Sequence, residues 1–134
     1  MKKIILLVLT TLLLTACVHN EDTLEAKVSD FEGSGFKNTK GQIIVLVEDG
    51  IMVSGSLRLD EKSKKSSIDE VFEKENAESD QLFSKVYNEG KIKTKGSNYY
   101  VTLDNNISLE FEKIGERIIK DSNGIEYFTQ EYSQ

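Results

Sequence analysis

The run Ile43-Ile44-Val45-Leu46-Val47-Glu48-Asp49-Gly50-Ile51-Met52-Val53 decides the fold class of this chain. Two short segments rich in β-branched residues flank an Asp-Gly pair, which is a strong local signal for a β-hairpin. After the Asp-Gly pair, Val53, Leu57 and Leu59 are all at odd positions, and alternate positions of a strand lie on the same face of a sheet. The sequence therefore predicts two antiparallel strands joined by a tight turn.

The C-terminal third has the same rhythm. In the segment 107–112, apolar residues at odd positions alternate with polar residues at even positions, which is typical of a half-buried antiparallel strand. Further β-rich segments lie at 91–95, 99–103, 117–120 and 125–129, with glycine- and asparagine-rich turns between them. The chain is therefore expected to form about six short strands in an antiparallel meander or a small β-barrel.

Two aromatic residues flank two glycines in Phe31-Glu32-Gly33-Ser34-Gly35-Phe36. A phosphate-binding loop would need the pattern G-x-G-x-x-G or a following Lys-Ser/Thr, and this stretch has neither. The pattern instead predicts a tight bend or a bulge where the first strand begins.

The segment between the two β-rich parts has helical features. Ser67 and Glu70 match a capping box, and the apolar residues that follow have helical spacing, with Gly90 as a possible stop. Polar residues at 75, 76 and 79 interrupt the apolar stripe. The segment is either two short helices, or one helix over about 67–75 followed by a strand from near Leu82. We expect a mostly β fold, with α+β as the alternative and one helical insertion around 67–88.

The chain begins with Lys2 and Lys3, followed by a continuous apolar-rich run from Ile4 to Leu14, which is the layout of a secretory signal. Leu14-Thr15-Ala16-Cys17 resembles the lipobox of bacterial lipoproteins. This resemblance implies cleavage between Ala16 and Cys17 and a diacylglyceryl group on the Cys17 sulfur. It also implies a protein held on the outer face of the cell membrane. The succession of short strands resembles small lipocalin-like lipoproteins of Gram-positive bacteria.

An uncleaved membrane helix is one alternative for the N-terminal segment, and an ordinary signal peptide, which would not need a cysteine just after a small residue, is the other. Eleven residues in a helix span about 16 Å, which is short of a hydrocarbon core of about 30 Å. We therefore expect a signal peptide over 1–16, a lipidated tether over 17–27 and a single small β-rich domain over 28–134. The single histidine, His19, lies in the predicted tether and has no evident partners there.

Charge and composition narrow the choice of partner. The chain has 17 basic and 23 acidic residues; removal of Lys2 and Lys3 with the signal peptide leaves 15 basic residues and a net charge of −8. That balance argues against binding nucleic acid, or anionic lipid through the protein surface. Because Cys17 is the only cysteine and His19 the only histidine, we expect neither a Cys/His metal site nor a cofactor.

The carboxylates offer few candidate sites. Glu110 and Glu112 share one face of a predicted strand, and lysines 91, 93 and 95 form a same-parity stripe nearby, so a solvated face is expected. Asp121-Ser122-Asn123-Gly124 hints at a calcium loop, but its glycine comes fourth instead of sixth, so a hairpin turn is expected. Asp104-Asn105-Asn106 is interpreted in the same way. No catalytic or metal site is predicted, and the ligand-binding residues stay unassigned.

Three functions fit these observations. The leading hypothesis is a non-enzymatic, membrane-anchored surface lipoprotein that binds a protein or envelope partner, with protection against an incoming toxin or phage as one form. The second is a small-molecule carrier whose aromatic residues line an apolar barrel cavity. The third is an envelope hydrolase that uses Glu110, Glu112 or Glu116.

Overall fold

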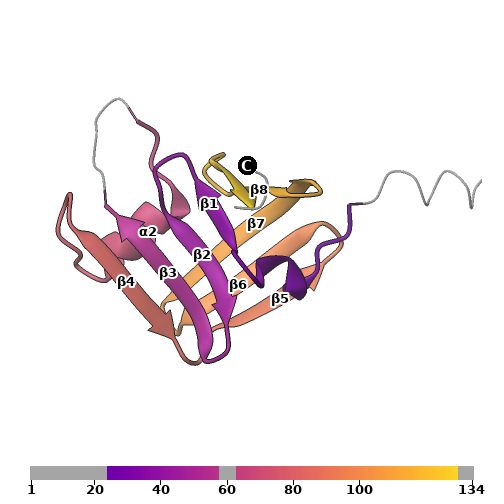
Figure 1. The fold of residues 1–134 in the computed structure, drawn as a ribbon, viewed down its shortest axis with the longest axis horizontal. Coiled ribbons are helices and arrows are strands. Elements are labelled where there is room, and N and C mark those ends of the chain that lie inside the picture. Colours follow the sequence, from indigo (N-terminus) through magenta and orange to yellow (C-terminus); the bar gives the residue numbers. More distant parts are fainter. Residues whose placement is uncertain (1–23, 58–62, 130–134) are drawn as a thin grey trace, which may run out of the picture.

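The fold is taken from a computed structural model that describes residues 24–57 and 63–129. One antiparallel sheet of nine strands is curled into a half-barrel (Figure 1), with the strand order β4-β3-β2-β1-β9-β8-β7-β6-β5. The strands are β1 (Phe36–Asn38), β2 (Ile43–Val47), β3 (Gly50–Ser56), β4 (Leu82–Tyr87), β5 (Lys91–Lys95), β6 (Asn98–Asp104), β7 (Ile107–Gly115), β8 (Ile118–Asp121) and β9 (Glu126–Thr129). A short 3-10 helix, η1 (Val28–Phe31), and one α-helix, α2 (Ser67–Lys74), complete the described fold. The prediction of a mostly β antiparallel fold is confirmed.

The local strand predictions are confirmed as well. Val47 of β2 pairs with Gly50 of β3, so the predicted hairpin forms, but its two turn residues are Glu48 and Asp49, and Gly50 is the first residue of β3. Along β3 and just beyond it, residues 51, 53, 55 and 57 are buried and those between them are half-buried, which matches the predicted parity. In β7 the alternation over 107–112 places the odd positions in the core and the even positions in solvent. Leu59 lies outside the described residues.

A short connection explains why the sheet curls. β4 and β5 are consecutive in the chain and are separated only by residues 88–90, yet they form opposite edges of the sheet. The four Cα–Cα steps from Tyr87 to Lys91 span at most about 14 Å, so the two edges approach each other at this end. The sheet therefore wraps around its apolar face.

The helical segment follows one of the two alternatives that the sequence left open. The helix occupies only Ser67–Lys74, so the insertion predicted around 67–88 contains a helix and a strand. Asn76 and Asp80 adopt positive φ values of 58° and 64°, which a continuous right-handed helix does not permit. The later residues pair with β3 as strand β4, with Phe83 and Tyr87 directed toward the core.

Aromatic side chains fill the interior of the half-barrel. Phe31 of η1 has no exposed surface, and its ring lies 4.9 Å from Phe36, 5.1 Å from Tyr99 and 6.0 Å from Phe111, measured between centroids. These edge-to-face and tilted contacts have the geometry that aromatic rings prefer. The rings that the carrier hypothesis assigns to a cavity lining therefore pack against one another.

Residues just before η1 also lie against the domain. Ala26 is buried, and its N–H donates to the carbonyl of Gly96 in the β5–β6 turn at 2.8 Å. Figure 1 shows η1 and α2 at opposite sides of the curled sheet. Ala26, which the sequence assigns to the tether, is thus in contact with the β5–β6 end of the sheet.

Several predictions concern residues beyond the part that the structure describes. The signal segment, the cleavage site at Ala16 and Cys17, the lipidation of Cys17 and the position of His19 all lie outside the described residues. No helix in residues 24–57 and 63–129 has the length and apolar character needed to span a membrane.

The bend before β1 depends on two glycines in the left-handed region, Gly33 at φ 73° and Gly35 at φ 66°. They differ in the space around them. A Cβ on Gly33 would meet nothing within 4 Å, whereas a Cβ on Gly35 would lie 2.4 Å from the carbonyl oxygen of Ile44. The two positions therefore separate backbone strain from steric clash.

We expect Gly33→Ala to lower the free energy of unfolding by about 1–2 kcal/mol, since only left-handed strain is added. Gly35→Ala adds an overpacking cost of about 1–3 kcal/mol to the same strain. Urea unfolding of both variants measures the difference. Equal losses for the two variants would contradict the close approach of β2 to Gly35.

Candidate binding groove between helix α2 and strand β7

The N-terminus of α2 is fixed by a reciprocal cap. The Ser66 hydroxyl accepts from the N–H of Asp69 at 3.0 Å, and the Asp69 carboxylate accepts from the N–H of Ser66 at 2.9 Å. The prediction that Ser67 and Glu70 form this capping box is wrong by one residue. The shift follows from tertiary contacts, because the N–H of Ser67 is directed to Asp121.

Asp69 is a buried carboxylate that joins α2 to the β1–β2 turn. It accepts from Lys40 Nζ at 2.6 Å and from Gln42 Nε2 at 2.7 Å, in addition to the cap. Gln42 is itself buried and accepts through Oε1 from Asn38 and Ser66. Burial raises the pKa of Asp69, but hydrogen bonds from Lys40, Ser66 and Gln42, with the charge of Lys40, more than offset it and hold the pKa below its usual value.

Asp30 in η1 has a related environment. Its carboxylate accepts from the hydroxyl of Tyr99 at 2.5 Å, from the N–H of Lys27 at 3.0 Å and from Lys113 Nζ at 3.1 Å. Burial raises the pKa of Asp30, and these three hydrogen bonds outweigh it, so the pKa is lowered.

These two carboxyls predict acid sensitivity. A carboxyl whose folded-state pKa is below its unfolded value of about 3.9 contributes stability above that pH and loses it as the pH falls through the folded value. The free energy of unfolding should therefore decrease below about pH 4. Asp69→Asn should be less stable at pH 7 and should show a shallower decrease below pH 4 in urea titrations. A decrease in the free energy of unfolding as steep as in the wild type would show that Asp69 does not contribute to the acid sensitivity.

A second buried carboxylate, Asp121 at the end of β8, joins the N-terminus of α2 to the β8–β9 turn. Its Oδ2 accepts from the N–H of Ser67 and from the hydroxyl of Tyr127, both at 2.8 Å. Its Oδ1 accepts from the N–H groups of Asn123 at 3.0 Å and Ile125 at 2.9 Å, which form the β8–β9 turn. Burial, followed by the charge of Asp121, raises the pKa of Tyr127, so this hydroxyl stays protonated as a donor. Oδ1 thus stabilises the hairpin turn predicted for 121–124, and Oδ2 joins this turn to α2.

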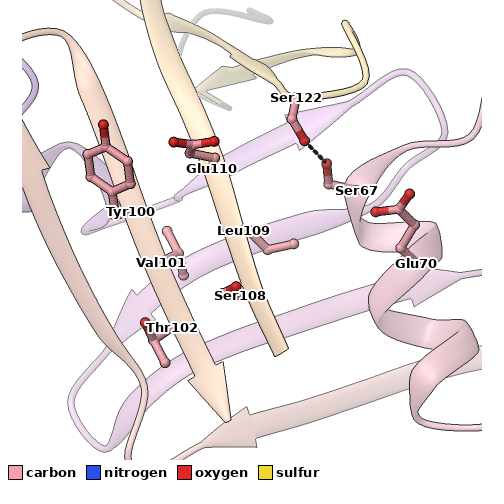
Figure 2. A pocket seen from close by; sticks show the side chains of 9 residues that line it. All are labelled: Ser67, Glu70, Tyr100, Val101, Thr102, Ser108, Leu109, Glu110 and Ser122. Carbon is pink, nitrogen blue, oxygen red and sulfur yellow. Dashed lines mark hydrogen bonds between the residues drawn. The ribbon is translucent and has the colours of Figure 1, made fainter. Parts of the chain in front are cut away.

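These contacts position an open groove of about 350 Å³. One wall consists of Ser67 and Glu70 of α2 together with Ser122, and the other wall consists of residues 108–110 of β7 and 100–102 of β6. Figure 2 shows the carboxylates of Glu70 and Glu110 on opposite walls and the Ser67 and Ser122 hydroxyls between them, 3.5 Å apart. The residues lining the groove include two carboxylates and no basic side chain.

The β7 wall of the groove is a free strand edge. The N–H of Lys113 donates to the carbonyl of Ser97 at 2.8 Å, and the register between β6 and β7 is unbroken from there to Ser108. In an antiparallel ladder alternate residues direct their backbone groups to the same neighbour, so Ser108 and Glu110 direct theirs away from β6. β8 pairs with β7 only from Phe111 onward. Within the described residues, the backbone of Ser108 and the N–H of Glu110 therefore lack a strand partner.

The structure separates the three glutamates considered as catalytic groups. Glu110 is exposed in the groove, whereas Glu112 lies opposite Lys120 of β8. Glu116 is exposed in the turn after β7. The predicted lysine stripe lies on β5, and β6 separates it from Glu110 and Glu112 of β7, so the lysines and these glutamates are not on neighbouring strands.

Sequence reasoning missed the α2 side of the groove. Ser67 and Glu70 were assigned to a capping box, and Ser122 to a turn. No local pattern connects these residues to β7, because they meet only when the β8–β9 turn and α2 come together at Asp121.

Comparison of the chain with models of known protein families, with curated protein sequences and with solved structures gave no match.

Proposed function

We propose that the protein is a lipid-anchored surface protein whose domain binds a protein partner and catalyses no reaction. The observation that carries the proposal is the free edge of β7 in the groove beside α2. Proteins normally pair, cover or guard such edges, because unpaired N–H and C=O groups attract another chain. An open edge beside a groove supports binding of a partner through its main chain.

The anchor in this proposal rests on the sequence. Leu14-Thr15-Ala16-Cys17 supplies the lipidation signal, and a diacylglyceryl group has the two acyl chains that stable membrane attachment needs. Six residues lie between Cys17 and Leu24, where the described domain begins, so the two Cα atoms are at most about 25 Å apart. The domain is thus held close to the membrane surface.

The test uses the full chain in a bacterial host. Cys17→Ser should release the protein from the membrane fraction or leave it unprocessed, because the lipid cannot be attached. In the same cells, a photoreactive phenylalanine analogue replaces Tyr100 at the rim of the groove and, as a control, Glu48 in the β2–β3 turn.

A discrete cross-linked product from position 100 and not from position 48 is expected. Membrane retention unchanged by Cys17→Ser would overturn the anchor. Failure of position 100 to give any product beyond that of position 48 would overturn the binding role.

A further inference from the structure

We infer that the groove binds an extended peptide segment of a partner protein, which adds to the free edge of β7 as an extra strand and alternates basic with apolar residues. The inference deepens the proposed function and rests on it. It specifies the chemistry of the partner and the main-chain groups that recognise it.

The position of the added strand follows from the register of the sheet. β8 pairs with β7 over Phe111 to Gly115 and then turns away at Asp121, where the Asp121 carboxylate holds the turn. An added segment continues the line of β8 along β7. It meets the N–H and C=O of Ser108 and the N–H of Glu110, which supply strand hydrogen bonds. Helix α2 forms the far wall of the slot.

The side-chain pattern of the segment follows from the two faces of β7. Ser108 and Glu110 are on the outer face of the sheet and Leu109 is on the core face, so alternate residues of an added strand point to these two sides. Outward residues of the segment lie beside the Glu110 carboxylate, and inward residues lie beside Leu109. The complementary sequence is therefore basic outward and apolar inward.

Glu70 extends the acidic side of the groove. One of its oxygens accepts from Asn123 Nδ2 at 3.3 Å, which orients the carboxylate at the rim of the groove. The groove lining contributes two negative charges from Glu70 and Glu110. A basic segment is thus favoured over an acidic one.

The two outer edges of the sheet differ from this site. On β5, Lys91, Lys93 and Lys95 guard the edge with positive charge. The β4 edge is open and apolar on its outer side, with Leu82 78% exposed and Val86 40% exposed. That edge suits an uncharged strand, and the experiment below separates it from β7.

The probe is the blocked peptide acetyl-Thr-Lys-Val-Lys-Thr-amide, titrated into full-length Cys17→Ser protein labelled with ¹⁵N. A second peptide of the same sequence has an N-methyl group on the backbone nitrogen of its second lysine, which lies opposite Ser108 when the peptide pairs antiparallel to β7 as β8 does. The methyl group removes one strand hydrogen bond and keeps the charge. The protein variants are Glu110→Lys and, as the matched charge control, Glu116→Lys. Both positions are exposed, so the fold is retained in both variants.

The parent peptide should bind with chemical-shift changes centred on Ser108 to Glu110, and hydrogen exchange of the Ser108 and Glu110 amides should slow on binding. The methylated peptide should bind about tenfold more weakly through loss of a strand hydrogen bond. Glu110→Lys should weaken binding about tenfold and Glu116→Lys less than twofold, with 0.5 M salt reducing the difference.

Equal binding of the two peptides would overturn strand addition. Equal weakening by the two charge variants would overturn recognition at Glu110, and protection of β4 amides in place of Ser108 would assign the segment to the other edge. If the peptide does not bind but the protein still cross-links from position 100, this inference is wrong and the proposed function stands. If position 100 gives no specific cross-link, both the proposed binding function and this inference are wrong.

Discussion

Replacing Asp121 with alanine should lower the free energy of unfolding by about 3 kcal/mol, because buried donors left without an acceptor cost about 1–3 kcal/mol each. Two of the four donors to this carboxylate are buried, the N–H of Ser67 and the hydroxyl of Tyr127. The carboxylate also lies at the N-terminus of α2, where negative charge is favourable. Urea unfolding at pH 7 measures the loss.

Two variants serve as controls. Asp121→Asn keeps the shape of the side chain and one acceptor oxygen, so its loss should fall between those of wild type and Asp121→Ala. Asp104→Ala removes an exposed aspartate from the β6–β7 turn and should cost less than about 1 kcal/mol. A loss for Asp121→Ala no larger than that for Asp104→Ala would show that the carboxylate does not hold α2 to the β8–β9 turn.

The second large effect is expected at Phe31. Truncation of a fully buried phenylalanine to alanine typically costs about 3–5 kcal/mol. Phe31→Ala removes ring contacts with Phe36, Tyr99 and Phe111, and with them the apolar anchor of η1. Since a domain of this size is stable by only about 5–15 kcal/mol, the loss is a large part of the total.

The matched control for Phe31 is in the same helical turn. Val28 is 38% exposed, so Val28→Ala should change the free energy of unfolding by no more than about 0.5 kcal/mol. Both variants are compared by urea unfolding, with the m-value followed to detect a change in compactness. A loss below 1 kcal/mol for Phe31→Ala would contradict the placement of this ring at the centre of the half-barrel.

The parts of the fold that were predicted correctly depend on local periodicity. The hairpin between β2 and β3 needs only a turn signal between two β-rich segments, and the alternation over 107–112 needs only a period of two. The turns at 104–106 and 121–124 follow from glycine and asparagine in the same way. These features are encoded within about ten residues, and the structure confirms them.

The missed features depend on contacts between distant segments. Ser66 and Asp69 cap α2 in place of Ser67 and Glu70 because Gln42 and Lys40 contact the cap from the β1–β2 turn. Helical spacing extended past residue 75, but β4 forms there because β3 offers a strand to pair with. Neither partner is visible in the local sequence.

The groove was beyond prediction for the same reason. The free edge exists because β8 is shorter than β7. β7 begins at Ile107, but β8 ends at Asp121, which lies opposite Phe111, so the residues of β7 before Phe111 have no partner in β8. The alternation in 107–112 identifies which side chains are exposed, but it does not reveal which backbone groups are paired. That information depends on the length of a neighbouring strand.

Amide hydrogen exchange of the free protein tests the free β7 edge most directly. The amides of Leu109 and Phe111 point to β6 and should be strongly protected, and Glu112 should be protected by Lys120 of β8. The amides of Ser108 and Glu110 should exchange much faster than those of their immediate neighbours. Protection of Ser108 and Glu110 equal to that of Leu109 would contradict the account, because it would show that the β7 edge is already paired.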